Sequence, residues 1–200
     1  MSSEEKQQYH HGNLRTALIE IAVLHLREEG MEQLSLRAMA RELGVSQTAP
    51  YRHFQDKNAL LAALAADGFA ELKTTTAKAA GNYSGDAAAA LQACGIAYVQ
   101  FARANPEKYL LMFGPGIVER QRYEELVNNS DASFRVLLNV IDQAQREKLF
   151  AGKPALMVAN TAWALVHGLS TLVIGHLQWV MSDKELEQQI SLATGMLTGR

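Results

Sequence analysis

Cysteine and proline are scarce in this chain. One cysteine, Cys94, and four prolines occur among 200 residues. A single thiol excludes an internal disulfide framework and fits a reducing compartment such as the cytosol. The few prolines leave long runs of alanine, leucine, glutamate and glutamine, which favour helices. No alternation of apolar and polar residues with hairpin turns is present, so the sequence predicts an all-α protein.

The motifs of the common enzyme classes are also missing. The sequence contains no nucleophile elbow, no phosphate-binding glycine loop and no metal-ligand cluster, and nothing beside Cys94 would activate its thiol. The adjacent His10 and His11 have no cysteine or acidic ligand at metal-site spacing, so we expect a solvated arm there. We therefore expect no enzyme, no metal site and no cofactor, and we interpret Cys94 as a buried apolar residue.

One uncharged run, residues 155–181, is long enough to span a bilayer. Its polar residues are spread along it instead of being gathered at its ends: Asn160, His167, His176 and Gln178. Such a helix can equally be buried between its own domain and a second subunit, with Gly168, Ser170 and Gly175 allowing a close approach. The N-terminus is polar and has no signal-peptide pattern. We expect a cytoplasmic protein without a membrane span.

Positive charge is not in excess. The formal net charge is −2, and residues 1–57 carry seven basic against eight acidic residues. Within them, residues 35–57 carry four basic against two acidic residues. Any binding of nucleic acid must therefore depend on local placement of positive charge and neutral donors, because no bulk basic field is available.

Residues 35–57 carry the pattern of two short helices joined by a tight turn. Ser35 can cap the first helix, because its hydroxyl can accept a backbone N–H that has no partner inside the helix. Apolar residues then recur on one face: Leu36, Met39, Ala40 and Leu43. Ala40 is small enough to let two helices cross closely. Gly44 can take the left-handed conformation that ends a helix, and we expect Val45 to be buried in the turn.

The second helix is predicted from Gln47 to His53, with Ser46 as its cap. Pro50 lies at the edge of its first turn, where a missing N–H begins to cost a hydrogen bond. A start one or two residues later is therefore the alternative. Either arrangement is a helix-turn-helix, whose second helix enters the major groove of DNA.

This segment resembles the DNA-binding region of the tetracycline-repressor (TetR) family of bacterial transcriptional regulators. The matching residues are Ser35, Leu36, Arg37, Ala40, Leu43, Gly44, Val45, Ser46, Tyr51, Arg52, His53, Phe54, Lys57 and Leu60. Two further stretches are similar to one subgroup of that family. They are Tyr9-His10-His11-Gly12-Asn13-Leu14-Arg15, and Trp163 with His167 and Gly168 in a Trp-x-x-x-His-Gly pattern.

On the DNA interpretation, Gln47 and Thr48 face base edges, since glutamine can bond adenine in a bidentate way and threonine can offer its methyl group to thymine. Tyr51 is expected to reach phosphates or flanking bases, and Arg37 and Lys57 the DNA backbone. The predicted DNA-binding residues are Arg37, Ser46, Gln47, Thr48, Ala49, Tyr51, Arg52, His53 and Lys57. For each one the alternative is a solvated polar side chain.

Two domains are expected: residues 1–56 for DNA binding, and residues 57–200 for ligand binding and dimerisation. Caps and apolar periodicity predict helices at 14–29, 57–79, 87–104, 106–113, 155–181 and 183–197, with a long helix after Gly116 that is broken near 128–130 and resumes at 134–149. The helix at 57–79 is the natural mechanical link between the domains. Aromatic and soft apolar residues on separate helices could line a ligand pocket, or simply form a core: Tyr98, Phe101, Met112, Phe113, Phe134, Trp163 and His167.

The resemblance implies a homodimeric repressor that binds a palindromic operator in double-stranded DNA and is released by an unidentified small-molecule ligand. The two recognition helices would then lie about 34–36 Å apart, one turn of DNA. The sequence leaves three alternatives open. They are a ligand-independent architectural DNA binder, an activator, and a protein-interaction module that does not bind DNA.

Overall fold

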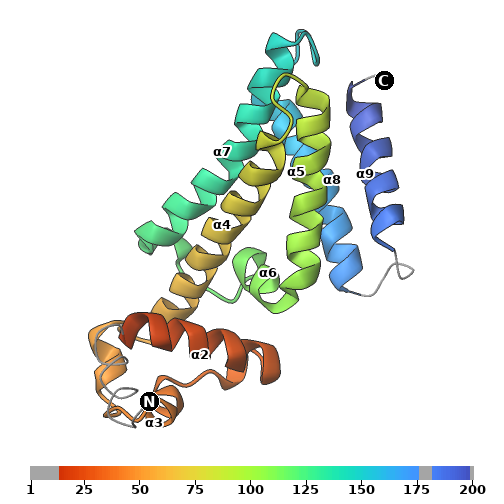
Figure 1. The fold of residues 1–200 in the computed structure, drawn as a ribbon. Coiled ribbons are helices and arrows are strands. Elements are labelled where there is room, and N and C mark those ends of the chain that lie inside the picture. Colours follow the sequence, from red (N-terminus) through yellow and green to blue (C-terminus); the bar gives the residue numbers. More distant parts are fainter. Residues whose placement is uncertain (1–13, 176–181, 199–200) are drawn as a thin grey trace, which may run out of the picture. The chain divides into compact units, whose positions relative to one another are not determined.

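The computed structural model describes residues 14–175 and 182–198, and all regular structure within them is helical (Figure 1). The elements in chain order are α2 Leu14–Glu28, η1 Met31–Gln33, α3 Leu36–Glu42, η2 Ala49–Arg52, α4 Lys57–Gly81, α5 Ala87–Ala104, α6 Pro106–Phe113, η3 Arg120–Arg122, α7 Glu124–Arg146, α8 Ala155–Ile174 and α9 Asp183–Thr198. The η elements are short 3₁₀ helices. The all-α prediction is confirmed.

The chain packs into two compact units. Unit 1 comprises Met1–Gly68 and Glu107–Val127, and unit 2 comprises Phe69–Pro106 and Asn128–Arg200. Segment 107–127 is far in sequence from residues 14–68 but belongs to the same compact unit. The functional division predicted at residues 56 and 57 stays a prediction.

In unit 1 the elements α2, η1, α3 and η2 pack on one another. The buried residues of α2 and α3 are Ala17, Leu18, Ile21, Ala22, Leu26, Leu36, Met39 and Ala40. Ser35 caps α3 as predicted, with its Oγ accepting the Ala38 N–H at 3.4 Å. Gly44 takes the expected left-handed backbone, with φ of 67°. Val45 is only half-buried, so the prediction that it is buried is wrong: the turn is open on one side.

Helix α4 begins where the sequence predicts. Asp56 Oδ1 accepts the Ala59 N–H at 2.8 Å, which satisfies a donor in the first turn. Further along, a Cβ on Gly68 would lie 2.6 Å from Met112 Sδ. Because glycine has no Cβ, α6 packs closely on α4 at this point, and Lys108 of α6 reaches Asp67 at 3.6 Å.

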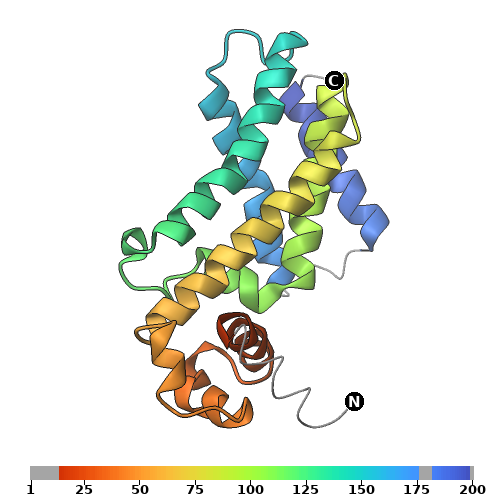
Figure 2. The same cartoon turned by 60° about the vertical axis from the view of Figure 1, so that its left-hand side comes forward.

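In unit 2 the helices α5, α8 and α9 pack against one another, and they lie side by side in Figures 1 and 2. Two carboxylates cap the start of α5: Glu147 accepts the Ala87 N–H at 2.8 Å and Asp86 the Ala89 N–H at 3.0 Å. At α9 the predicted capping box is confirmed. Ser182 donates its N–H to Glu185 at 2.8 Å, and its Oγ accepts the Glu185 N–H at 3.3 Å. Ser182 Oγ also donates to Glu185 Oε2 at 2.7 Å, and this bond, together with the one from the Ser182 N–H, lowers the pKa of Glu185.

Three predictions about the long helices α7 and α8 are wrong. Helix α7 runs without a break through Asn128, Asn129 and Ser130, because these side chains are exposed or half-exposed and need not interrupt the buried face. It also ends at Arg146, three residues earlier than expected. Helix α8 ends at Ile174, with Gly175 as its C-cap, instead of reaching residue 181. His176 and Gln178 lie outside the described residues.

Candidate nucleic-acid interface

The second helix of the helix-turn-helix is a single 3₁₀ turn. It covers Ala49–Arg52, so the prediction of a longer helix from Gln47 capped by Ser46 is wrong, and the alternative of a later start is confirmed. Ser46 Oγ instead pairs with Thr48 Oγ1 at 3.2 Å. Pro50 explains the difference. It has no N–H to give to an α-helical bond, and its ring fixes φ early in the turn.

Pro50 and Phe54 fix this turn to unit 1. Pro50 is fully buried and Phe54 is 3% exposed, and the Phe54 N–H is bonded to the Pro50 carbonyl at 3.0 Å. The polar side chains around them are exposed: Gln47, Thr48, Tyr51, Arg52 and His53. We call this set the recognition surface. It is a row of donors and acceptors held by an apolar base, which suits base edges and phosphates.

The other predicted DNA-binding residues differ in their exposure. Arg37 and Ser46 are exposed, whereas Ala49 is half-buried. Lys57 is half-buried and donates its Nζ to the Glu32 carbonyl at 2.6 Å. An ammonium group has three donors. Lys57 therefore ties the start of α4 to η1 with one of them.

Sequence reasoning missed the contacts that brace this module. The Arg15 guanidinium lies 5.7 Å from the centre of the Phe54 ring and bonds Glu125 at 2.8 Å. His25 on α2 lies 2.8 Å from Glu42 on α3. No local pattern could have revealed these pairs, since 110 residues separate Arg15 from Glu125.

A second polar group lies inside unit 2. Trp163 Nε1 donates to the Tyr98 hydroxyl at 3.1 Å, and this hydroxyl lies 3.1 Å from His167 Nδ1. Since the indole N–H can only donate, the Tyr98 oxygen accepts it, and the Tyr98 proton is available for Nδ1. Phe134 packs edge-on against Trp163, with ring centres 5.9 Å apart. The one-turn spacing in the Trp-x-x-x-His motif brings both side chains to one hydroxyl.

These contacts join four of the seven residues predicted for a ligand pocket. Phe101 is buried on α5, the helix that carries Tyr98. Met112 and Phe113 belong to unit 1. Cys94 is buried as interpreted, and burial raises its pKa to about 12. Among the residues that the structure describes, no three His, Cys, Asp or Glu side chains gather as a metal site would require.

The acceptor role of His167 predicts a pH dependence. Burial lowers the pKa of His167 below its ordinary 6.5, so below that pH the unfolded chain binds a proton that the folded chain resists. The free energy of unfolding should therefore fall as the pH drops below about 6.5. His167→Gln keeps an acceptor but does not titrate, so its slope should be shallower than that of the wild type. Urea unfolding between about pH 7.5 and 5.5 measures both slopes; equal slopes would contradict the assignment.

Two family models match most of this chain. Residues 18–64 match "Bacterial regulatory proteins, tetR family" and residues 91–191 match "Tetracyclin repressor-like, C-terminal domain". The chain belongs to the TetR family. Whether it belongs to the subgroup suggested by the Trp-x-x-x-His-Gly pattern stays a prediction, and residues 9–13 of the other subgroup motif lie outside the described residues.

Curated relatives of this TetR-family chain are regulators. An HTH-type transcriptional regulator of Mycobacterium tuberculosis is 30% identical over 106 residues, which are 50% of this chain and 44% of the relative. The class C tetracycline repressor protein of Escherichia coli is 51% identical over 51 residues, covering 26% of this chain and 23% of the repressor. The chain thus spans less than half the length of either curated relative.

Solved structures share the fold over nearly the whole chain. A protein of unknown function from Rhodococcus sp. RHA1 is 34% identical, with a TM-score of 0.82 over 95% of this chain and 98% of its own. PfmR, a TetR-family transcriptional regulator from Thermus thermophilus, is 17% identical, with a TM-score of 0.67 over 91% and 97%. The second likeness concerns the fold alone.

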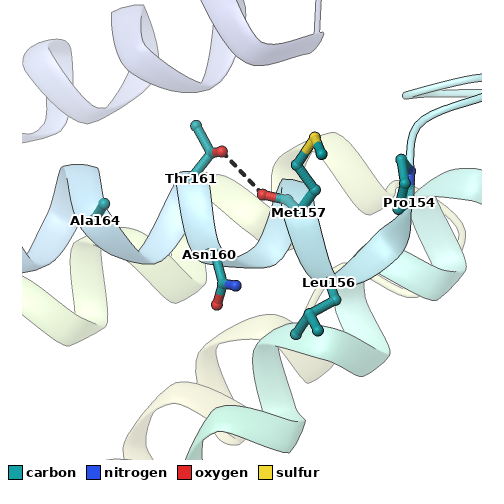
Figure 3. Close-up of a pocket in the computed structure, with 6 residues that line it drawn as sticks. All are labelled: Pro154, Leu156, Met157, Asn160, Thr161 and Ala164. Carbon is teal, nitrogen blue, oxygen red and sulfur yellow. Dashed lines mark hydrogen bonds between the residues drawn. The ribbon is translucent and has the colours of Figure 1, made fainter.

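The outer face of α8 in this TetR-family chain is apolar and largely uncovered. Among the described residues α8 is the one helix long and apolar enough to span a bilayer, and 22% of its most apolar stretch is buried. A hollow of about 620 Å³ lies on it, and Figure 3 shows its lining: Pro154, Leu156, Met157, Asn160, Thr161 and Ala164. Nothing lies within 4 Å of a Cβ placed on Gly168. Ser170 is fully buried, and its Oγ donates to the Val166 carbonyl at 2.7 Å.

Proposed function

We propose that this TetR-family chain is a sequence-specific DNA-binding transcriptional repressor of the cytoplasm. It acts as a homodimer on a palindromic operator and is released by a small-molecule ligand. The observation that carries the DNA-binding part is the recognition surface: five polar side chains exposed around a turn whose Pro50 and Phe54 are buried. A turn that only packed against its own protein would have no need of so many exposed donors and acceptors at its rim.

The outer faces of α8 and α9 support the homodimer. Leu192 and Met196 on α9 are 66% and 77% exposed, and Leu156 and Met157 on α8 are 56% and 59% exposed. The opposite faces of both helices are buried within unit 2. In a dimer with a two-fold axis, the exposed apolar faces of α8 and α9 in one subunit would pack against the same faces of the other. The large α9 side chains would then fill the hollow on the partner's α8. Packing against a second subunit would also explain why the outer face of α8 is apolar, with no need for a membrane.

The ligand part of the proposal rests on the group formed by Tyr98, Phe134, Trp163 and His167. Aromatic walls with a few directed polar atoms are typical of small-molecule sites between helices. The dimer would exchange between a form whose recognition surfaces match the operator spacing and a form whose surfaces do not. A ligand that binds the second form more tightly would increase its population and so lower operator affinity. Loss of operator binding upon adding compounds to the pure protein would separate this function from ligand-independent binding.

Selection of bound sequences from random double-stranded DNA tests the proposal as a whole. We expect an enriched inverted repeat with half-sites about 10 base pairs apart, centre to centre, or a multiple of that spacing. Binding that stays equal for all sequences at every salt concentration would overturn sequence-specific recognition. A single half-site without a repeat would leave DNA binding intact and overturn the homodimer.

A further inference from the structure

The first turn of α4 carries an amide side chain whose two N–H groups and oxygen are all engaged. Asn58 Oδ1 accepts the Val118 N–H at 3.0 Å, and Asn58 Nδ2 donates to the Val118 carbonyl at 2.9 Å and to the Tyr123 hydroxyl at 2.7 Å. Asn58 therefore pairs with the backbone of Val118 at two points, much as a neighbouring strand would. Asparagine is suited to this because it offers donors and an acceptor together, whereas ionised aspartate can only accept.

The Val118 side chain contributes little to holding the backbone that Asn58 bonds. The Val118 side chain is 66% exposed. The next residue, Glu119, is in the left-handed region, with φ of 51° and ψ of 48°. A non-glycine residue keeps this conformation only when its surroundings hold it there. The two bonds from Asn58 fix the peptide groups directly before Glu119.

The connection between α6 and α7, residues 114–123, also packs against η1, which directly precedes the helix-turn-helix. Ile117 is buried, and a Cβ on Gly116 would collide with the side chain of Met31 in η1. Lys57, the neighbour of Asn58, donates to the Glu32 carbonyl of the same η1. The connection, the start of α4 and η1 thus form one closed set of contacts within unit 1.

We infer that Asn58 is a positioning residue for DNA recognition, which acts by fixing the connection 114–123 against α4 and η1. Three residues separate His53 of the recognition surface from Lys57. A shift of the α4 start is therefore passed to the recognition surface over a short, braced stretch of chain. Asn58 has no need to contact DNA itself. This inference rests on the proposed DNA binding.

The test compares Asn58→Ala and Tyr123→Phe with the wild type. Asn58→Ala removes all three bonds, and Tyr123→Phe removes only the one to the hydroxyl. We expect Asn58→Ala to weaken binding to the selected operator roughly 3–30-fold while leaving binding to random DNA unchanged. Tyr123→Phe should fall between Asn58→Ala and the wild type, and the double variant should be no weaker than Asn58→Ala. Asn139→Ala, an exposed amide on α7, is the control.

The ratio of specific to random-DNA affinity separates positioning from simple loss of stability. A smaller folded fraction would lower both affinities by the same factor, whereas a displaced recognition surface lowers only the specific one. Backbone amide shifts give a second measure. In Asn58→Ala the amide of Val118 must change, and on the inference the amides of Tyr51 and His53 change as well.

An unchanged ratio together with unchanged Tyr51 and His53 amides would overturn the inference. If Asn58→Ala does not fold, Tyr123→Phe gives the same two measurements with one bond removed. Failure of the wild type to bind any sequence selectively would overturn the proposed function instead. The amide shifts would then still report whether Asn58 positions the recognition surface.

Discussion

Replacing Tyr51 with alanine should lower operator affinity by about 100-fold or more, with no change in the fold. Tyr51 is 44% exposed beside the buried Pro50, so its phenol can reach a phosphate without any rearrangement of the turn. A hydrogen bond to a charged group contributes about 1.5–3 kcal/mol. A homodimer on a palindrome would lose that contact in both half-sites, so the free-energy loss would double.

The measurement is fluorescence anisotropy with the selected operator, accompanied by thermal unfolding followed by circular dichroism. Tyr83→Ala is a matched control, because Tyr83 is 45% exposed but lies in unit 2. It should bind like the wild type. Operator affinity that is unchanged in Tyr51→Ala, with both proteins folded, would show that Tyr51 does not contribute to operator binding.

Features set by neighbours in the sequence could be predicted. The caps at Ser35 and Asp56 and the capping box of Ser182 and Glu185 each depend on a side chain reaching a backbone group three residues away. The left-handed Gly44 is equally local, because only the steric freedom of glycine matters there. Such features depend on residues within a few positions of one another and on no distant contact.

Features set by distant segments could not be predicted. Asn58 looks like an ordinary residue in a first helical turn, and its partners lie 60 and 65 residues away. The later start of η2 was visible as an alternative, because Pro50 lacks an N–H. The burial of Pro50 and Phe54 was not visible, since it depends on the tertiary packing of unit 1. In the candidate pocket, the sequence spacing of Trp163 and His167 was visible. That both would bond to Tyr98 could not be predicted, because Tyr98 was one of several aromatic residues in the sequence.

Placing a carboxylate at Met196 should convert the proposed dimer to monomers. Met196 is 77% exposed on α9, so Met196→Glu would cost the isolated chain little. In the dimer it would bury an unpaired charge twice, once from each subunit, and such burial costs several kcal/mol per ion. The dissociation constant should rise at least about 100-fold, which corresponds to about 2.7 kcal/mol.

Light scattering coupled to size-exclusion chromatography measures this across protein concentrations, with a chain mass of 22.0 kDa as the monomer reference. Leu110→Glu is the control, because Leu110 is 56% exposed on α6 and lies outside the α8 and α9 faces. It should remain dimeric. A monomeric wild type would contradict the proposed homodimer. A dimer whose dissociation constant does not change in Met196→Glu would show that the interface does not include this part of α9.

The same variant links assembly to recognition. Each recognition surface would be intact in a Met196→Glu monomer, because Met196 belongs to unit 2 and the surface to unit 1. Such a monomer should bind an isolated half-site with the affinity of the wild type. Its affinity for the full inverted repeat should be lower, because two recognition surfaces are no longer joined in one dimer. Equal loss on both DNAs would mean that Met196 affects the fold and not the assembly. Loss confined to the full inverted repeat would tie operator affinity to the pairing of α8 and α9 across a two-fold axis.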